Sequence, residues 1–253
     1  MASRRVALVT GSSSGIGAAV ATALARAGFD VVVNYGRSAE AAKATVAACN
    51  AGGSDTLLVQ CDVSSEADVE AMIAAVKSRY GRLDVVCSNA GVSIDIPPKD
   101  FHTIDVDEWD RVFSVNVRGL FLVAKHAREM LIEGEDPCMV NTASIVGLRP
   151  GAQPLPYSAS KAAVVSMTQT LANALGPKVR VNAVAPGWME GDWMKWMLGD
   201  SYEKLMTRRA KATPLKRCVT AEDIAEVVVT LVQHMKFVTG ETITVDGGFA
   251  KTT

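Results

Sequence analysis

Short apolar runs alternate along this chain with longer stretches of helical periodicity. The apolar runs are rich in Val, Ile and Leu and lack polar alternation, which is typical of strands buried on both faces. Strands are predicted at residues 5–11, 30–35, 55–63, 83–91, 138–144, 178–187 and 241–248. Helices are predicted between them, at residues 15–28, 38–53, 66–80, 107–133, 157–175 and 221–233.

This alternation predicts an α/β protein. Strands and helices joined by short connections form parallel sheets with right-handed crossovers. We therefore expect residues 1–253 to form a single doubly wound domain of the Rossmann type, with a parallel sheet of about seven strands and helices on both faces. Residues 186–214 interrupt the pattern and are predicted to be an insertion rich in Trp and Met.

Composition and charge exclude several classes of protein. The net charge is −1, so no overall field attracts nucleic acid or an anionic membrane, and no segment reaches the roughly 18 apolar residues of a membrane span. The five cysteines form no Cys-x-x-Cys pair and the three histidines show no ligand spacing, so no metal site is predicted. Reduced cysteines and an N-terminus without a signal-peptide pattern lead us to expect a cytoplasmic protein.

A turn rich in glycine and serine between the first strand and the first helix predicts a nucleotide site. It reads Thr-Gly-Ser-Ser-Ser-Gly-Ile-Gly over residues 10–17. Glycines let the backbone approach a pyrophosphate, and a helix N-terminus offers free N–H groups and a positive dipole end. A structural turn would use the same residues, but the place between strand and helix favours binding. The candidate contacts are Gly11, Ser13, Ser14, Gly15, Ile16 and Gly17.

The end of the second strand bears on the choice of cofactor. It carries Tyr35, Arg37 and Ser38, with no Asp or Glu directly after the strand. A carboxylate at this place usually holds a ribose 2′-OH, whereas an arginine suits a 2′-phosphate. NADP(H) is therefore favoured, with NAD(H) as the alternative, and the other interpretation of Arg37 is a surface residue in a turn.

Tyr157 and Lys161 are four residues apart in a predicted helix, which places a phenol and an ammonium on the same face. Taken alone, such a pair is more often a half-buried tyrosine and a solvated lysine. Free tyrosine has a pKa of about 10, too high for ready proton exchange near neutrality. A nearby ammonium favours the phenolate, so we expect Lys161 to lower the pKa of Tyr157 and to prepare it for proton transfer.

These motifs occur in order with Asp62-Val63, Asn89-Ala90-Gly91, Asn116, Ser144 and Pro186-Gly187. Together they resemble the classical short-chain dehydrogenase/reductase family, over almost the whole chain from Arg5 to about Phe249. The chain is most similar in appearance to members that act as 3-oxoacyl-(acyl carrier protein) reductases. The resemblance implies hydride transfer between NAD(P)(H) and a carbonyl compound or secondary alcohol.

The resemblance also implies roles for individual residues. The catalytic set would be Asn116, Ser144, Tyr157 and Lys161: Ser144 bonds the substrate carbonyl, Lys161 also holds the nicotinamide ribose, and Asn116 helps to hold a proton-relaying water. Asp62 would contact the adenine. Further cofactor contacts would come from Val63, Asn89, Ala90, Gly91, Pro186 and Gly187. Pairing through helices 107–133 and 157–175 would give a homotetramer.

The insertion is expected to be a lid over the substrate. Methionine adapts to irregular shapes and tryptophan offers a broad apolar face, so an apolar ketone or 3-oxoacyl compound would suit it. The alternative is a helix packed on the core or on another subunit. The candidate lid residues are Trp188, Met189, Trp193, Met194 and Met197.

Two departures from the family pattern bear on function. Gly191 stands where many members have a threonine that bonds the nicotinamide amide. Glu133, Glu135 and Asp136 precede the fifth strand, where like charge disfavours docking of an acidic acyl carrier protein. The alternatives to a reductase are an NAD-dependent alcohol dehydrogenase working in the oxidative direction and a catalytically silent binding protein.

Overall fold

The computed structural model describes residues 4–149, 151 and 153–252, and within them seven parallel strands form one sheet. The order of the strands is β3-β2-β1-β4-β5-β6-β7, which confirms the predicted Rossmann-type fold. Each predicted strand is present, with shorter bounds. They are β1 Val6–Val9, β2 Asp30–Tyr35, β3 Thr56–Gln60, β4 Val85–Ser88, β5 Cys138–Thr142, β6 Arg180–Pro186 and β7 Thr242–Val245.

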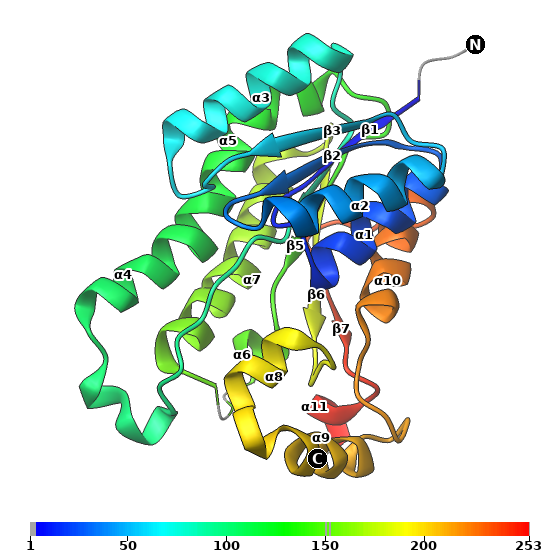
Figure 1. Ribbon diagram of the computed structural model, residues 1–253. Coiled ribbons are helices and arrows are strands. Elements are labelled where there is room, and N and C mark those ends of the chain that lie inside the picture. The colour runs from blue at the N-terminus through cyan, green and yellow to red at the C-terminus, as the bar shows by residue number, and fades with distance from the viewer. Residues whose placement is uncertain (1–3, 150, 152, 253) are drawn as a thin grey trace.

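Helices cover both faces of the sheet (Figure 1). On one face, α1 (Gly15–Arg26), α2 (Ala39–Ala51) and α10 (Ala221–Gln233) bury a core that includes Leu24 and Ile224. On the other, α3 (Glu66–Tyr80), α5 (Gly119–Ile132) and α7 (Leu155–Leu175) bury a second core. Strands with Val on both faces are needed to fill both cores, which explains the absence of polar alternation.

The helix predicted at 107–133 consists of three parts. An α-helix, α4 (Val106–Phe113), is followed by a π-helical turn, η2 (Ser114–Arg118), and then by α5. Asp105 begins α4 by accepting the backbone N–H of Asp107 at 2.9 Å. Asn116 lies in the π-helical turn, and such turns occur mainly where a site requires them.

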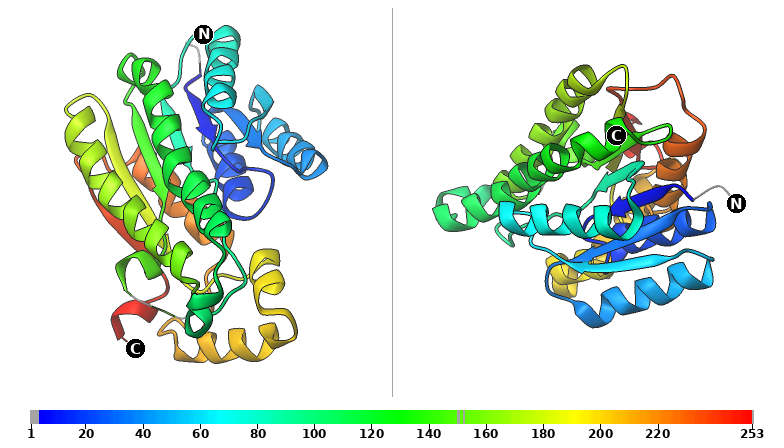
Figure 2. Two further views of the ribbon diagram at one scale, coloured as in Figure 1. Left: turned by 90° about the vertical axis from the view of Figure 1, so that its left-hand side faces the viewer. Right: turned by 90° about the horizontal axis from the view of Figure 1, so that it is seen from above.

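The insertion contains α8 (Asp192–Leu198), the 3₁₀ turn η3 (Gly199–Ser201) and α9 (Tyr202–Ala212). These elements gather at one end of the molecule together with α11 (Phe249–Thr252), as both Figure 1 and the left view of Figure 2 show. Two further short elements, η1 (Pro98–Thr103) and α6 (Ile145–Leu148), were not predicted. None of the described helices is both long and apolar enough to cross a membrane.

Candidate active site

A cleft of about 1190 Å³ lies at the carboxyl ends of the strands. It exceeds the roughly 300–1,000 Å³ of a site for a drug-sized ligand, so a dinucleotide and a substrate have room together. The turn after β1, the ends of β4 and β6, the start of α7 and the insertion all contribute to its wall. This is the edge of a parallel sheet at which ligands bind.

Buried polar side chains hold the strand ends together beneath the cleft. Asn34 Oδ1 accepts the N–H of Gly11 at 3.0 Å, and its Nδ2 donates to the carbonyl of Cys61 at 3.1 Å. Thr10 Oγ1 accepts the N–H groups of Asn89 and Ala90 at 3.0 and 3.1 Å. Sequence reasoning missed Asn34, although an amide inside the apolar run Val-Val-Val-Asn-Tyr was the available signal.

The N-terminus of α1 is open to the cleft. Ser14 begins the helix without a side-chain cap, so its first N–H groups keep their donor capacity. Gly15 has φ +54°, and a Cβ at this position would meet no atom within 4 Å. Uncapped N–H groups beside an open backbone suit the pyrophosphate of a dinucleotide. The residues present therefore fit the predicted cofactor.

Most of the predicted cofactor residues line the cleft, and three do not. Gly17, Tyr35 and Ser38 lie outside the lining. A Cβ on Gly17 would lie 2.4 Å from the carbonyl oxygen of Gly11, so this glycine permits close packing of helix and turn. Arg37 is exposed and lines the cleft. The other residues that line it as predicted are Gly11, Ser13, Ser14, Gly15, Ile16, Asp62, Val63, Asn89, Ala90, Gly91, Tyr157, Lys161, Pro186 and Gly187.

Three of the four predicted catalytic residues meet in the cleft. Ser144 begins the short helix α6, and its side chain hydrogen-bonds that of Tyr157, near the start of α7. The Lys161 ammonium is buried, lies 5.7 Å from the centre of the Tyr157 ring and donates to the carbonyl of Thr142 at 2.7 Å. Gly147 makes this possible, because a Cβ there would lie 2.6 Å from the backbone of Lys161.

The predicted effect of Lys161 on Tyr157 is wrong for the protein alone. Burial raises the pKa of Tyr157 to about 12, against a lowering contribution from the hydrogen bond with Ser144. Burial also lowers the pKa of Lys161 to about 8. The ammonium is directed to Thr142 rather than to the phenol oxygen, so it does not offset the loss of solvent around the phenol. Tyr157 is therefore a protonated acid at neutral pH.

The side chain of Asn116 hydrogen-bonds Val92 and Ser160 rather than entering the cleft. Its side chain is 3% exposed; Oδ1 accepts the N–H of Val92 at 2.8 Å, and Nδ2 donates to the Val92 carbonyl at 3.0 Å and to Ser160 Oγ at 2.9 Å. Ser160 in turn donates to the carbonyl of Tyr157 at 2.7 Å. Asn116 thus ties the chain after β4 to the helix that carries Tyr157.

A small cavity of about 10 Å³ is lined in part by Lys161. It has room for about one water, and its polar lining includes Asn116, Lys161, Thr10 and Ser88. The Ser88 hydroxyl is buried and has no hydrogen-bond partner among the described residues. That Asn116 helps to hold a water remains a prediction, and this cavity is the candidate place.

All five predicted lid residues line the cleft. The Trp193 ring lies edge-on to that of Tyr157, with centroids 5.8 Å apart and planes at 82°. Gly191 has φ +133°, a conformation that threonine rarely adopts, and its N–H donates to the Tyr202 hydroxyl at 3.4 Å. Sequence reasoning missed several polar residues of the lining, which lie in loops or on α8, α9 and α10 and carry no motif. They are Arg149, Gln153, Glu190, Asp192, Arg208, Arg209 and Glu222.

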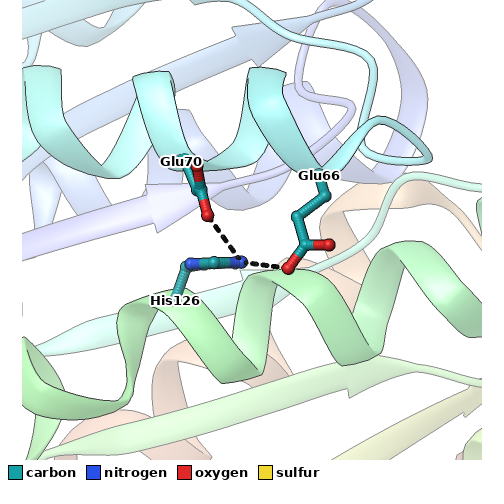
Figure 3. A group of neighbouring side chains, drawn as sticks. All are labelled: Glu66, Glu70 and His126. Atoms are coloured by element: carbon teal, nitrogen blue, oxygen red, sulfur yellow. Dashed lines mark hydrogen bonds and ion pairs between the residues drawn. The ribbon is translucent and has the colours of Figure 1, made fainter.

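Three possible metal ligands meet away from this cleft, between α3 and α5 (Figure 3). His126 Nε2 lies 3.0 Å from a carboxylate oxygen of Glu66 and 3.8 Å from one of Glu70. The ammonium of Lys125 contacts the same oxygen of Glu66 and, with His126, lowers the pKa of that carboxyl. The ammonium of Lys125 thus already occupies the carboxylate oxygen that a metal would need. We therefore interpret Glu66, Glu70, Lys125 and His126 as an ion-pair cluster that joins α3 and α5.

The acidic segment before β5 is largely neutralised by the chain itself. Asp136 pairs with Arg5, Arg180 and Lys236, and Glu135 lies 3.1 Å from Arg82. The segment therefore presents less negative charge than its sequence suggests.

Comparisons with known proteins agree with this geometry. The sequence model of the family described as "Enoyl-(Acyl carrier protein) reductase" matches residues 11–250. "Granaticin polyketide synthase putative ketoacyl reductase 2" of Streptomyces violaceoruber is 41% identical over 243 residues, which cover 96% of this chain and 95% of that protein. The 3-oxoacyl-[acyl-carrier-protein] reductase FabG of Staphylococcus aureus is 36% identical, with 96% of each chain covered. The crystal structure of levodione reductase matches with a TM-score of 0.90 and 32% identity over 97% of both chains.

Proposed function

This chain belongs to the classical short-chain dehydrogenase/reductase family and is an NAD(P)-dependent oxidoreductase, and we propose that it reduces an apolar ketone or 3-oxoacyl-type compound with NADPH. The observation that supports this function most directly is that Ser144, Tyr157 and Lys161 meet in one cleft, where the Tyr157 phenol hydrogen-bonds Ser144. The phenol is protonated at neutral pH, as tyrosine ordinarily is, and can give its proton to a carbonyl oxygen.

Each of the proposed catalytic residues has its own role in the reduction. A bound nicotinamide cofactor would supply the hydride for the carbonyl carbon. Ser144 and Tyr157, which hydrogen-bond each other, can both donate to the carbonyl oxygen, and Tyr157 transfers its proton as negative charge develops there. Lys161 would hold the ribose hydroxyls, while Asn116 and Ser160 fix the start of α7 and thereby the position of Tyr157.

The preference for NADPH rests on Arg37. Its guanidinium lies at the end of β2, is exposed in the cleft wall and makes no ion pair with any described residue. A 2′-phosphate would supply the missing partner through charge-assisted hydrogen bonds. NADH lacks this group, so it would bind more weakly at the same place.

The cleft wall supports an apolar carbonyl compound as substrate. Trp188, Trp193 and three methionines of the insertion form a broad apolar surface beside Tyr157. The granaticin relative is named as a putative ketoacyl reductase and the solved structure as a levodione reductase, in keeping with this choice. All five cysteines are free and buried, which suits the reducing cytoplasm as the compartment.

Two other functions are less well supported. An alcohol dehydrogenase working in the oxidative direction needs the phenolate of Tyr157, which the raised pKa disfavours near neutrality. A catalytically silent binding protein would not need Ser144, Tyr157 and Lys161 together in one cleft.

A substrate panel tests the proposal. Apolar ketones, diketones and 3-oxoacyl thioesters of N-acetylcysteamine, coenzyme A and acyl carrier protein are mixed with the enzyme, and NADPH or NADH consumption is followed by absorbance. We expect turnover of several ketones, faster with NADPH, and no special advantage of the carrier-protein thioester. Oxidation of secondary alcohols without reduction of any ketone at neutral pH would contradict the proposal.

A further inference from the structure

Arg209 of α9 contacts two aromatic rings in the wall of the cleft. Its guanidinium carbon is 4.4 Å from the centre of the Trp188 ring and 5.5 Å from that of Phe249. All three residues line the cleft. The three elements that carry them meet at the foot of Figure 1, where α9 lies next to α11 and below the end of β6.

The positive charge of Arg209 has no partner within the described part of the chain. Its guanidinium makes no ion pair there, and Nε is buried without a hydrogen-bond partner. Burial and the neighbouring charge of Arg208, which also lines the cleft, lower the pKa of Arg209. Arg79 and Arg217, by contrast, each bind a carboxylate, at 2.6 and 2.5 Å. A partly buried charge of this kind costs free energy unless a ligand of opposite charge forms hydrogen bonds with it.

The contacts with the rings leave the donors of Arg209 available. The guanidinium carbon lies over the Trp188 and Phe249 rings, and attraction to ring faces uses none of the five N–H groups of the guanidinium. Contact with two rings also restricts the orientations that the guanidinium can adopt. A carboxylate or phosphate can accept two parallel hydrogen bonds from the N–H groups of such a guanidinium.

The cofactor has its own anion sites elsewhere in the cleft. The open N-terminus of α1 suits the pyrophosphate, and Arg37 suits a 2′-phosphate. Arg209 stands instead on the insertion, beside the Trp and Met wall that we assign to the substrate.

We propose that Arg209 is an anion-binding subsite for the substrate, so that the preferred ketone has an apolar body and an anionic end. The proposal rests on the reductase function given above. The apolar body would lie on the insertion near Trp193 and Tyr157, and the anion would bind Arg209. The anion is either the carboxylate of an oxo acid or a phosphate of a pantetheine-type thioester, since both present the same oxygens to the guanidinium.

The test compares charged and neutral substrates of one shape. Oxo acids with increasing separation of ketone and carboxylate, such as 4-oxopentanoate, 5-oxohexanoate and 7-oxooctanoate, are paired with their methyl esters. A 3-oxoacyl coenzyme A thioester is paired with its N-acetylcysteamine analogue, which lacks phosphate. The variants are Arg209→Gln, Arg209→Lys and the control Lys204→Gln, which removes an exposed charge on the same helix outside the cleft lining.

The readout is the ratio of kcat/KM for the charged substrate to that for its neutral partner. We expect this ratio to fall about tenfold or more in Arg209→Gln, less in Arg209→Lys, and by less than about twofold in Lys204→Gln. A fall confined to the oxo acids identifies a carboxylate as the natural anion, and a fall confined to the coenzyme A pair identifies a phosphate.

An unchanged ratio in Arg209→Gln would overturn the subsite, as would an equal fall in the control or an equal weakening of NADPH binding. Fluorescence of the tryptophans that line the cleft gives a second readout that needs no turnover. If the wild type reduced no ketone, the proposed function would fail. The anion subsite would still be supported if the wild type bound the oxo acids more tightly than their esters and Arg209→Gln lost this difference. Equal binding of acids and esters by the wild type would rule out the subsite.

Discussion

At the scale of single residues, environment rather than identity decides what the catalytic groups do. Tyr157 and Lys161 have the spacing that predicts an activated phenol, yet burial dominates and raises the pKa of the tyrosine to about 12. The identity and spacing of the pair were predictable from the sequence. The direction of the pKa change was not, because it depends on where the ammonium points, and the Lys161 ammonium points to Thr142.

The pH dependence of ketone reduction follows from these two groups. Tyr157 stays protonated far above neutrality, whereas Lys161, with its pKa lowered to about 8, loses its charge as the pH rises through that value. We expect kcat/KM for reduction to be level below about pH 7 and to fall above about pH 8. Alcohol oxidation, which needs the phenolate, should rise with pH instead.

A pH–rate profile with NADPH measures this directly. The Lys161→Arg variant keeps its charge at all these pH values, so whatever activity it retains should lack the fall near pH 8. A wild-type rate of reduction that rose between pH 7 and pH 9 would contradict this assignment.

Arg37 gives a prediction on cofactor choice. The Arg37→Ala variant should weaken NADPH binding by about 1–3 kcal/mol, the usual worth of a charge-assisted hydrogen bond, and should change NADH binding little. Titration of both cofactors, followed by fluorescence or calorimetry, supplies the two dissociation constants. Equal weakening of both would show that the guanidinium does not bind the 2′-phosphate.

At the scale of elements, hydrophobic periodicity predicted every strand and the helices that cover the sheet, because burial between two layers leaves a strong pattern. The short helix α6 was missed, and the bounds of α8 and α9 within the insertion were not predicted, since these helices lie at the end of the sheet and bury few residues. The π-helical turn was also missed, although the poor helix propensity of Asn116 inside a long helical pattern was a sign of it.

The hydrogen bonds of Asn116 predict a cost in stability. Replacement by alanine would leave the N–H and the carbonyl of Val92 without their side-chain partner in a partly buried place. It would also remove one of the two hydrogen bonds of the Ser160 hydroxyl, which keeps its bond to the Tyr157 carbonyl. We expect the free energy of unfolding to fall by about 2–4 kcal/mol, as measured by urea denaturation. Turnover should fall as well, because α7 loses a contact beside Tyr157. A loss below about 0.5 kcal/mol would mean that the π-helical turn holds its shape without this side chain.

At the scale of the whole molecule, apolar side chains on the surface predict self-association. Phe121 of α5 is 50% exposed, and Phe237, in the turn before the edge strand β7, is fully exposed. The exposed ring on α5 and the exposed ring beside the edge strand are surfaces that a second copy of the chain could cover. We expect a homotetramer with a mass about four times 26.7 kDa by light scattering at micromolar concentration. The Phe121→Glu variant should form smaller species, and a monomeric wild type would rule the tetramer out.

The central claim is that Tyr157 supplies the proton in a carbonyl reduction, and its loss is the most direct test. Tyr157→Phe removes one hydroxyl and leaves the ring that packs against Trp193. With the best ketone and saturating NADPH, we expect kcat to fall by about 10²–10⁴, the range for a lost general acid, while the dissociation constant of NADPH changes less than about twofold. A variant that kept more than about a tenth of wild-type turnover would contradict the account, because another group would then have to donate the proton.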